Sequence, residues 1–286
     1  MGSDTLTFES TSKMAVTTNG SIHYHDVGDG EPVVFIHGSG PGVSGWANFE
    51  GNLPLFSQHY RCLVPDLPGF GLSEATGEFP TTAGHEAIAR FLDTLDVERV
   101  SIVGNSLGGI VGSRFAAAYP DRIRNLISIG GMGMNVLSPA PSEGIKLLVA
   151  FVEDPTRERL VEWMESMVFD ASILTDELIE RRLAQAQRPE IAAEARKMYS
   201  RAGLPFIRQS LNGTGAAANI EHLPRIEAPT LLLWGRDDRV SPVDMALVPM
   251  RLIPKCELHV LYDCGHWVMI ERRAEFNSTV LAFLGR

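Results

Sequence analysis

The sequence predicts an α/β fold in which helices cover both faces of a mainly parallel sheet. Short apolar runs rich in β-branched residues alternate with longer segments of helical periodicity. The apolar runs are nearly continuous, as expected for strands that are buried on both faces. The chain of 286 residues is 44% hydrophobic and 21% charged. It is therefore long enough to bury a substantial core, and too polar for a membrane protein.

The expected strands are short and begin with an extended pair near the N-terminus. In chain order they are 15–18, 21–27, 32–36, 61–65, 100–104, 125–129, 230–234 and 257–262. Helical patterns follow several of these strands, each after a turn. The expected helices are 46–57, 82–95, 106–119, 242–252 and 273–284.

The stretch 137–213 interrupts this alternation, because it is helical, rich in Met, Glu and Arg, and contains no convincing strand. We interpret it as a helical cap inserted into a core formed by residues 1–136 and 214–286. Its place in the chain puts it above the carboxyl edge of the sheet, where ligands bind in α/β proteins. An independent helical domain is less favoured, since neither flank resembles a flexible linker.

Charge and cysteine content argue against several classes of function. The net charge of −10 and the lack of a basic run disfavour nucleic-acid binding. The three cysteines lack the spacing of a metal site and the density of a disulfide framework, which fits a reducing compartment. No apolar run approaches the roughly 20 residues that span a bilayer, and the polar N-terminus has no signal-peptide pattern. We therefore expect a cytoplasmic protein that binds neither membrane nor nucleic acid.

The clearest chemical motif is Gly-Asn-Ser-Leu-Gly at 104–108, which follows an apolar strand and precedes a helical pattern. In this context G-x-S-x-G predicts a nucleophile elbow, a strained strand-to-helix turn that presents a serine. The flanking glycines remove side chains that would collide in the turn. The motif therefore predicts Ser106 as a nucleophile; a glycine-rich packing turn is the alternative for this segment alone.

A serine hydroxyl needs a base and an acid that orients the base. His266 is the expected base, because it is the one histidine in a glycine turn after the last expected strand. The acid should follow strand 230–234, where Asp237 and Asp238 are adjacent. We choose Asp238, since the third residue after Gly235 has room to turn back toward the sheet, whereas Asp237 suits a surface turn.

Acyl transfer by such a group also requires N–H donors for the negative charge that develops on the carbonyl oxygen. Leu107, the residue after the nucleophile, provides the first. The second is expected from the loop after strand 32–36, which reads His-Gly-Ser-Gly at 37–40. We assign it to Ser39; a plain glycine turn is the alternative for this loop.

Taken together, these motifs resemble the meta-cleavage product hydrolases, enzymes that hydrolyse carbon–carbon bonds in aromatic and steroid ring degradation. The resemblance covers nearly the whole chain and implies an α/β-hydrolase fold with a helical cap. The matching segments are HGSGPGVSGWANF at 37–49, DLPGFGLS at 66–73, GNSLGG at 104–109, EGIKLL at 143–148, AQAQRP at 184–189, WGRDDRVSP at 234–242 and CGHWVMIE at 264–271.

The resemblance implies roles for four further residues. Arg188 would bind the substrate carboxylate, Asn48 and Asn105 would contact the dienoate oxygens, and Trp267 would line the site beside the base. These residue types suit the roles, because arginine presents a forked donor and asparagine offers both a donor and an acceptor. On the residues alone, Arg188 is equally compatible with a solvated helix end.

The reaction that the resemblance implies is hydrolysis of a 2-hydroxy-6-oxohexa-2,4-dienoate, after enol–keto tautomerisation, to a 2-hydroxypenta-2,4-dienoate and a carboxylic acid. It implies no cofactor, a homo-oligomer, and an acyl substituent of phenyl or steroid size. Whether the intermediate is an acyl-enzyme or a gem-diol stays open. A carboxylesterase or lactonase with the same triad is the first alternative, and a non-catalytic ligand receptor on the same fold is the second.

Overall fold

Eight strands form one sheet in the order β1-β2-β4-β3-β5-β6-β7-β8 in the computed structural model, which describes residues 6–211 and 213–286. The strands are β1 (Ser12–Thr17), β2 (Gly20–Val27), β3 (Pro32–Ile36), β4 (Arg61–Pro65), β5 (Val100–Asn105), β6 (Ile123–Ile129), β7 (Thr230–Gly235) and β8 (Cys256–Leu261). β2 pairs antiparallel with β1 and with β4, and all other pairs are parallel. Every expected strand is present, and the predicted α/β-hydrolase fold class is confirmed.

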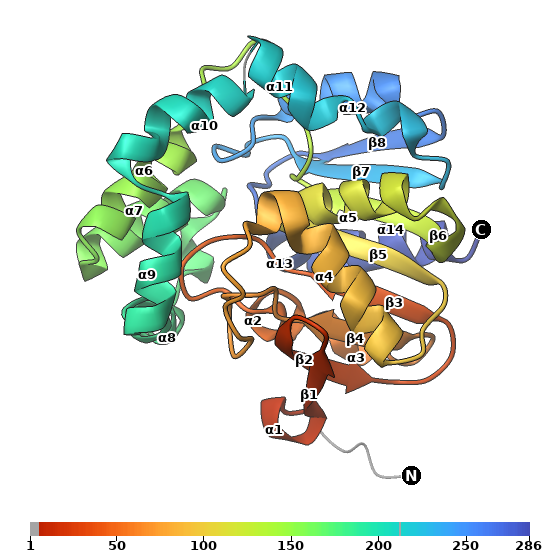
Figure 1. The fold of residues 1–286 in the computed structure, drawn as a ribbon. Helices are drawn as coiled ribbons and strands as arrows, with labels where there is room; N and C mark the ends of the chain where they lie inside the picture. The colour runs from red at the N-terminus through yellow and green to blue at the C-terminus, as the bar shows by residue number, and fades with distance from the viewer. Residues whose placement is uncertain (1–5, 212) are drawn as a thin grey trace.

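Helices pack on both faces of this sheet (Figure 1). One apolar cluster joins the sheet to α4 (Pro80–Thr94), α5 (Leu107–Ala118) and α12 (Leu247–Leu252), and a second joins it to α3 (Leu53–Phe56) and α14 (Arg273–Leu284). Neighbouring residues of one strand enter opposite clusters, because successive side chains of a strand point to opposite faces. The nearly continuous apolar runs in the sequence follow from this two-sided burial.

Two expected helices differ from the structure. The segment 46–57 is broken into α2 (Gly45–Phe49) and α3, because Pro54 has no N–H to continue the helix. At the break the buried Asn52 donates to Met269 O at 3.0 Å and to Asn277 Oδ1 at 2.9 Å. The segment 242–252 begins as the 3₁₀ helix η5 (Val243–Ala246) before α12. Pro249 has no N–H to continue a regular helix across that junction.

Among the described residues, six α-helices lie between β6 and β7, and we propose that they form the cap. They are α6 (Glu143–Glu153), α7 (Arg157–Met167), α8 (Asp176–Ala186), α9 (Pro189–Met198), α10 (Leu204–Leu211) and α11 (Gly213–Ile220). They lie beside the edge of the sheet at which β5 passes into α5 (Figure 1). Because α11 continues past the expected boundary at residue 213, we propose that the cap ends near Ile220.

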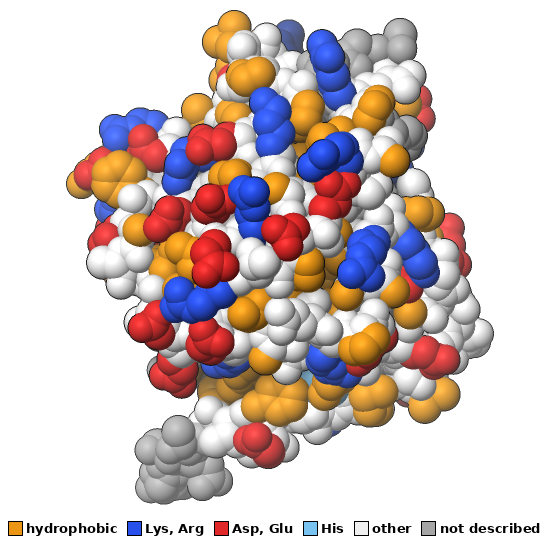
Figure 2. Space-filling view, turned by 90° about the vertical axis from the view of Figure 1, so that its left-hand side faces the viewer, with side chains coloured by type: hydrophobic (Ala, Val, Ile, Leu, Met, Phe, Trp, Pro, Cys, Tyr) orange, Lys and Arg blue, Asp and Glu red, His pale blue; other side chains and the backbone are white. Residues whose placement is uncertain are grey.

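The cap has an apolar inner side and a charged outer side. Leu148, Phe151, Trp163 and Met164 of α6 and α7 are buried in the same cluster as one face of the sheet. Figure 2 shows the outer side, where basic and acidic side chains are intermixed. None of the helices in the described part of the chain combines the length and the apolar character required to cross a bilayer.

Asp244 of η5 fixes the segment that leads from the sheet into the cap. Its Oδ2 accepts hydrogen bonds from the N–H groups of Val136, Leu137 and Ser138 at 2.9, 2.8 and 3.1 Å. The Ser138 hydroxyl donates to its Oδ1. Burial acts to raise the pKa of Asp244, but these donors outweigh burial and lower the pKa below its usual value.

We expect Asp244→Asn to lower the free energy of unfolding at pH 7 by about 1–3 kcal/mol, because an amide places its own donors against those N–H groups. The ionised carboxylate stabilises the fold above the usual pKa of 3.8, and this stabilisation disappears as the pH falls through the lowered native value. Urea unfolding from pH 7 down to pH 3 should therefore show that the free energies of unfolding of the wild type and the variant become more similar at acid pH. The exposed Asp154→Asn serves as a control that changes little; a difference that stays constant with pH would contradict the explanation.

Candidate active site

Ser106 occupies a strained turn between β5 and α5. Its backbone has φ 52° and ψ −112°, a conformation that L-residues rarely adopt. A Cβ on Gly104 would lie 2.2 Å from Gly108 O, and one on Gly108 would lie 2.1 Å from Ile36 O. Both glycines are therefore required for the close approach of the helix to the strands. The Ser106 N–H donates to Ile129 O at 2.7 Å, which ties the turn to β6.

An imidazole–carboxylate pair lies at the same edge of the sheet. His266 Nδ1 is 2.7 Å from Asp238 Oδ2, and both side chains are about 1% exposed. Asp238 Oδ1 accepts from the N–H groups of Val240 and Ser241 at 2.8 and 2.7 Å, which fixes the carboxylate. Asp237 lies outside this pair and forms an ion pair with Arg236 at 3.2 Å. The structure thus pairs His266 with Asp238 and not with its neighbour, and the catalytic role of Asp238 stays a prediction.

Backbone contacts from the cap hold the turn that carries His266. Its N–H donates to Met167 O, at the end of α7, at 2.7 Å. Glu271 also bridges the two segments: its Oε2 accepts from Gly265 N at 2.6 Å and its Oε1 from Phe169 N at 2.7 Å. Burial raises the pKa of Glu271, while these N–H donors act to lower it. The position of the imidazole therefore depends on the cap as well as on the sheet.

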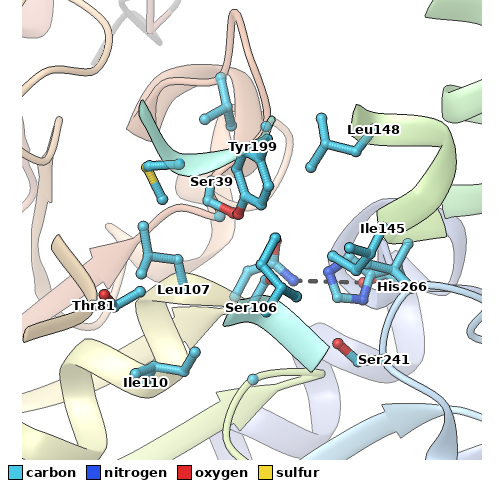
Figure 3. Close-up of a pocket in the computed structure, with 18 of the residues that line it drawn as sticks. Ser39, Thr81, Ser106, Leu107, Ile110, Ile145, Leu148, Tyr199, Ser241 and His266 are labelled. Carbon is cyan, nitrogen blue, oxygen red and sulfur yellow. Dashed lines mark hydrogen bonds between the residues drawn. The ribbon is translucent and has the colours of Figure 1, made fainter. Parts of the chain in front are cut away.

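Ser106 and His266 line one cavity of about 410 Å³ between the sheet and the cap. Figure 3 shows both side chains bordering this space, with Ser39 and Tyr199 above Ser106. Among the described residues no hydrogen bond joins the Ser106 hydroxyl to the imidazole. Catalytic hydrogen bonds are often long before substrate binds and tighten in the complex.

The two expected oxyanion donors also line this cavity. Within residues 6–211 and 213–286, the N–H groups of Ser39 and Leu107 donate to no other atom, which leaves both available for a ligand oxygen. Asn48 Oδ1 accepts from Gly38 N at 3.1 Å and so orients the loop. The Ser39 hydroxyl is hydrogen-bonded to Tyr199 of the cap.

Arg188 does not lie in the cavity, which corrects the role expected for it. Its side chain is 36% exposed, and its guanidinium pairs with Glu190 and donates to Gln185 Oε1 at 3.3 Å. Arg188 immediately precedes α9 and is partly exposed, which fits the alternative of a solvated helix end. Arg182 of α8, which is 7% exposed, lines the cavity, and so does Arg114 of α5.

Arg182 is a buried cation without a counter-ion. Its Nη1 has no hydrogen-bond partner, and the side chain forms no ion pair in the described part of the chain. Its Cζ lies 5.5 Å from the ring centroid of Trp267. Burial lowers the pKa of the guanidinium to about 10, so it remains charged at neutral pH. A charge held in this state favours binding of an anion.

The other residues implied by the resemblance line the cavity, but two of them have structural bonds as well. Trp267 is 2% exposed and packs under Arg182. Asn105 Nδ2 donates to Ile129 O at 3.3 Å and to His266 O at 3.5 Å, so these bonds leave its Oδ1 unused. Asn48 bonds to Gly38 through its Oδ1, so its Nδ2 takes no part in that bond. Their contacts with substrate remain a prediction.

Sequence reasoning missed Arg182, Tyr199 and Glu271. A signal for Arg182 was present, because Ile179, Arg182 and Ala186 recur at helical spacing and form the buried face of α8. The bonds of Tyr199 and Glu271 join segments far apart in the chain, so no local pattern could reveal them. No group of three His, Cys, Asp or Glu side chains suited to a metal ion occurs in the part of the chain that the structure describes.

The arrangement combines a strained serine, an imidazole oriented by a carboxylate, two free N–H donors and a buried cation in one cavity. It suits attack on a carbonyl carbon of an anionic substrate. Residues 31–273 match the family model described as alpha/beta hydrolase fold.

Relatives with named activities indicate one group of enzymes within this fold family. The chain is 39% identical to a 2-hydroxy-6-oxononadienedioate/2-hydroxy-6-oxononatrienedioate hydrolase of Pseudomonas sp, over 94% of this chain and 93% of that protein. It is 37% identical to a 2-hydroxy-6-oxo-6-phenylhexa-2,4-dienoate hydrolase of Burkholderia cepacia, over 96% and 97% of the two chains.

Solved structures agree with these relatives. The meta-cleavage product hydrolase CumD of Pseudomonas fluorescens IP01 superposes with a TM-score of 0.86 and 29% identity, over 97% of this chain and 98% of that one. The phenylhexadienoate hydrolase BphD of a Rhodococcus strain gives 0.83 and 25%, over 96% and 98%. The chain therefore belongs to the α/β-hydrolase fold family and, within it, to the meta-cleavage product hydrolases.

Proposed function

We propose that this protein hydrolyses the C5–C6 bond of 2-hydroxy-6-oxohexa-2,4-dienoates, with Ser106, His266 and Asp238 as the catalytic residues. The observation that carries the proposal is the uncompensated Arg182 in the same cavity as Ser106 and His266. An ester substrate has no need of such a cation, whereas a dienoate presents a carboxylate at C1. The names of the relatives agree with this substrate class.

In the first step Arg182 binds the C1 carboxylate by charge-assisted hydrogen bonds. The 2-hydroxyl then loses its proton, its electron pair forms the C2 carbonyl, and C5 gains a proton. His266 is our candidate for this proton relay, since its Nε2 is the ring nitrogen not occupied by Asp238. The resulting 2,6-diketone can release its C5 fragment as a conjugated enolate, whereas a bare carbanion would be too poor a leaving group.

In the second step Ser106 Oγ attacks C6 and its proton passes to His266, which Asp238 orients and stabilises. The N–H groups of Leu107 and Ser39 donate to the oxyanion. The C5–C6 bond then breaks, its electron pair enters the dienolate, and His266 returns the proton to that fragment. Hydrolysis of the acyl group releases a carboxylic acid and a 2-hydroxypenta-2,4-dienoate; a gem-diol route through direct attack of water uses the same groups.

Two other expectations from the sequence stay predictions. They are assembly as a homo-oligomer and location in the cytoplasm. The comparisons do not determine the acyl substituent. The relative named for a dienedioate and the relative named for a phenyl substrate are 39% and 37% identical to this chain.

Asp238→Asn should lower kcat for a dienoate by roughly 10³–10⁴-fold, because an amide facing Nδ1 stabilises the tautomer that cannot accept the serine proton. The loss of dienolate absorbance measures the rate. Asp237→Asn is the matched control, since the neighbouring carboxylate lies outside the pair. Equal losses in the two variants would contradict the assignment of Asp238.

Arg182→Met should lower kcat/KM for dienoates by about 100-fold while leaving hydrolysis of a simple aryl ester nearly unchanged, since the ester has no carboxylate to bind. Removing an unpaired buried charge should not destabilise the fold. Arg188→Met is the control and should change neither rate. An equal loss on both substrates would instead favour a general esterase with no carboxylate site.

A further inference from the structure

The cavity continues past Ser106 on the side away from His266. Ile110 and Thr81 border it there, opposite the imidazole (Figure 3). Ser113 and Arg114 of α5, Ser210 of α10 and Asn219 of α11 also line it. This arm of the cavity therefore lies between α5 and the α10–α11 end of the cap.

Arg114 is a second cation without a counter-ion. Its Nε is buried with no hydrogen-bond partner, and its Nη2 makes one long contact of 3.5 Å with Asn219 Oδ1. It forms no ion pair in the part of the chain that the structure describes. Burial lowers the pKa of this guanidinium, and Glu221 acts more weakly to raise it.

The other titratable groups that act on Arg114 do not neutralise it. Burial lowers the pKa of His85, and it lowers that of His222 to about 4, so both imidazoles are neutral at pH 7. Lys197, a further basic residue that lines the cavity, is already paired with Glu194 at 2.6 Å. Arg114 and Arg182 are thus the cavity-lining cations that an anionic ligand would stabilise.

These two arginines lie near opposite ends of the cap. Arg182 belongs to α8, whereas Arg114 contacts α11, and Figure 1 shows α8 and α11 at the two ends of the cap. Ser106 lies between them, because it precedes α5 and Arg114 follows it by eight residues, or about 12 Å along the helix. Arg114 lines the same cavity as Ser106, and helical side chains lean toward the N-terminus, which is the end of α5 that Ser106 precedes.

We propose that Arg114 is a specificity-determining residue that binds a carboxylate at the far end of the acyl substituent. The inference rests on the proposed function, with the C1 carboxylate at Arg182 and C6 at Ser106. A substituent of a few carbons with an anionic terminus then spans the gap between Ser106 and Arg114. The preferred substrate is accordingly a dicarboxylate, rather than one with the phenyl- or steroid-sized group expected from the sequence.

The test compares two substrates that differ in one group. These are 2-hydroxy-6-oxonona-2,4-dienedioate and 2-hydroxy-6-oxonona-2,4-dienoate, which has a methyl group in place of the terminal carboxylate. The wild type should have a kcat/KM about 10- to 100-fold higher for the dicarboxylate, the range expected for a charge-assisted hydrogen bond. Arg114→Met should abolish this preference by lowering kcat/KM for the dicarboxylate alone, and Arg188→Met should leave it unchanged.

Each outcome distinguishes the two proposals. Turnover of both substrates by the wild type without a preference would overturn the role of Arg114 and leave the proposed function intact. An equal loss on both substrates in Arg114→Met, with an unaltered thermal midpoint, would also overturn it. Turnover of neither substrate would overturn the proposed function itself. If Arg114→Met does not fold, Arg114→Lys decides: retained preference supports the proposal, and wild-type rates without preference refute it.

Discussion

The close packing of α5 against β5 and β3 is the constraint on which the site depends. Gly104 and Gly108 allow the backbone of the helix to approach the strands at distances that any side chain would prevent. This packing keeps Ser106 in a left-handed conformation, with its hydroxyl directed into the cavity and the N–H of Leu107 free. The cost of the strained backbone, of order 1–3 kcal/mol, is balanced by the surrounding sheet and helix.

The cap contributes to the site through hydrogen bonds as well as through the cavity wall. Met167 O and Glu271 link the end of α7 to the turn of His266, while Tyr199 links α9 to the loop of Ser39. A displacement of the cap would therefore change the positions of the base and of one oxyanion donor together. Substrate contacts with Arg182 on α8 provide a physical means of coupling occupancy of the cavity to this alignment.

The sequence predicted the sheet, the pair of Asp238 and His266, and the elbow, because each depends on short segments with a strong local signal. The carboxylate-binding role expected for Arg188 was wrong, because it came from the matched AQAQRP segment. The buried face of α8, on which Arg182 lies, was the better signal. At the break in the helix expected at 46–57, Pro54 gave a local signal, whereas Asn52 bonds to residues more than 200 positions away. Such long-range contacts leave no periodic pattern in the sequence.

The proposed reaction requires a dienoate to lie in one orientation, with its carboxylate at Arg182 and its C6 carbonyl at Ser106. A crystal structure of the Ser106→Ala variant with bound dienoate tests this most directly. We expect the C1 carboxylate within hydrogen-bond distance of Arg182 and the C6 oxygen between the N–H groups of Ser39 and Leu107. A dienoate whose carbonyl carbon lies away from residue 106, or whose carboxylate is bound elsewhere, would contradict the proposed reaction.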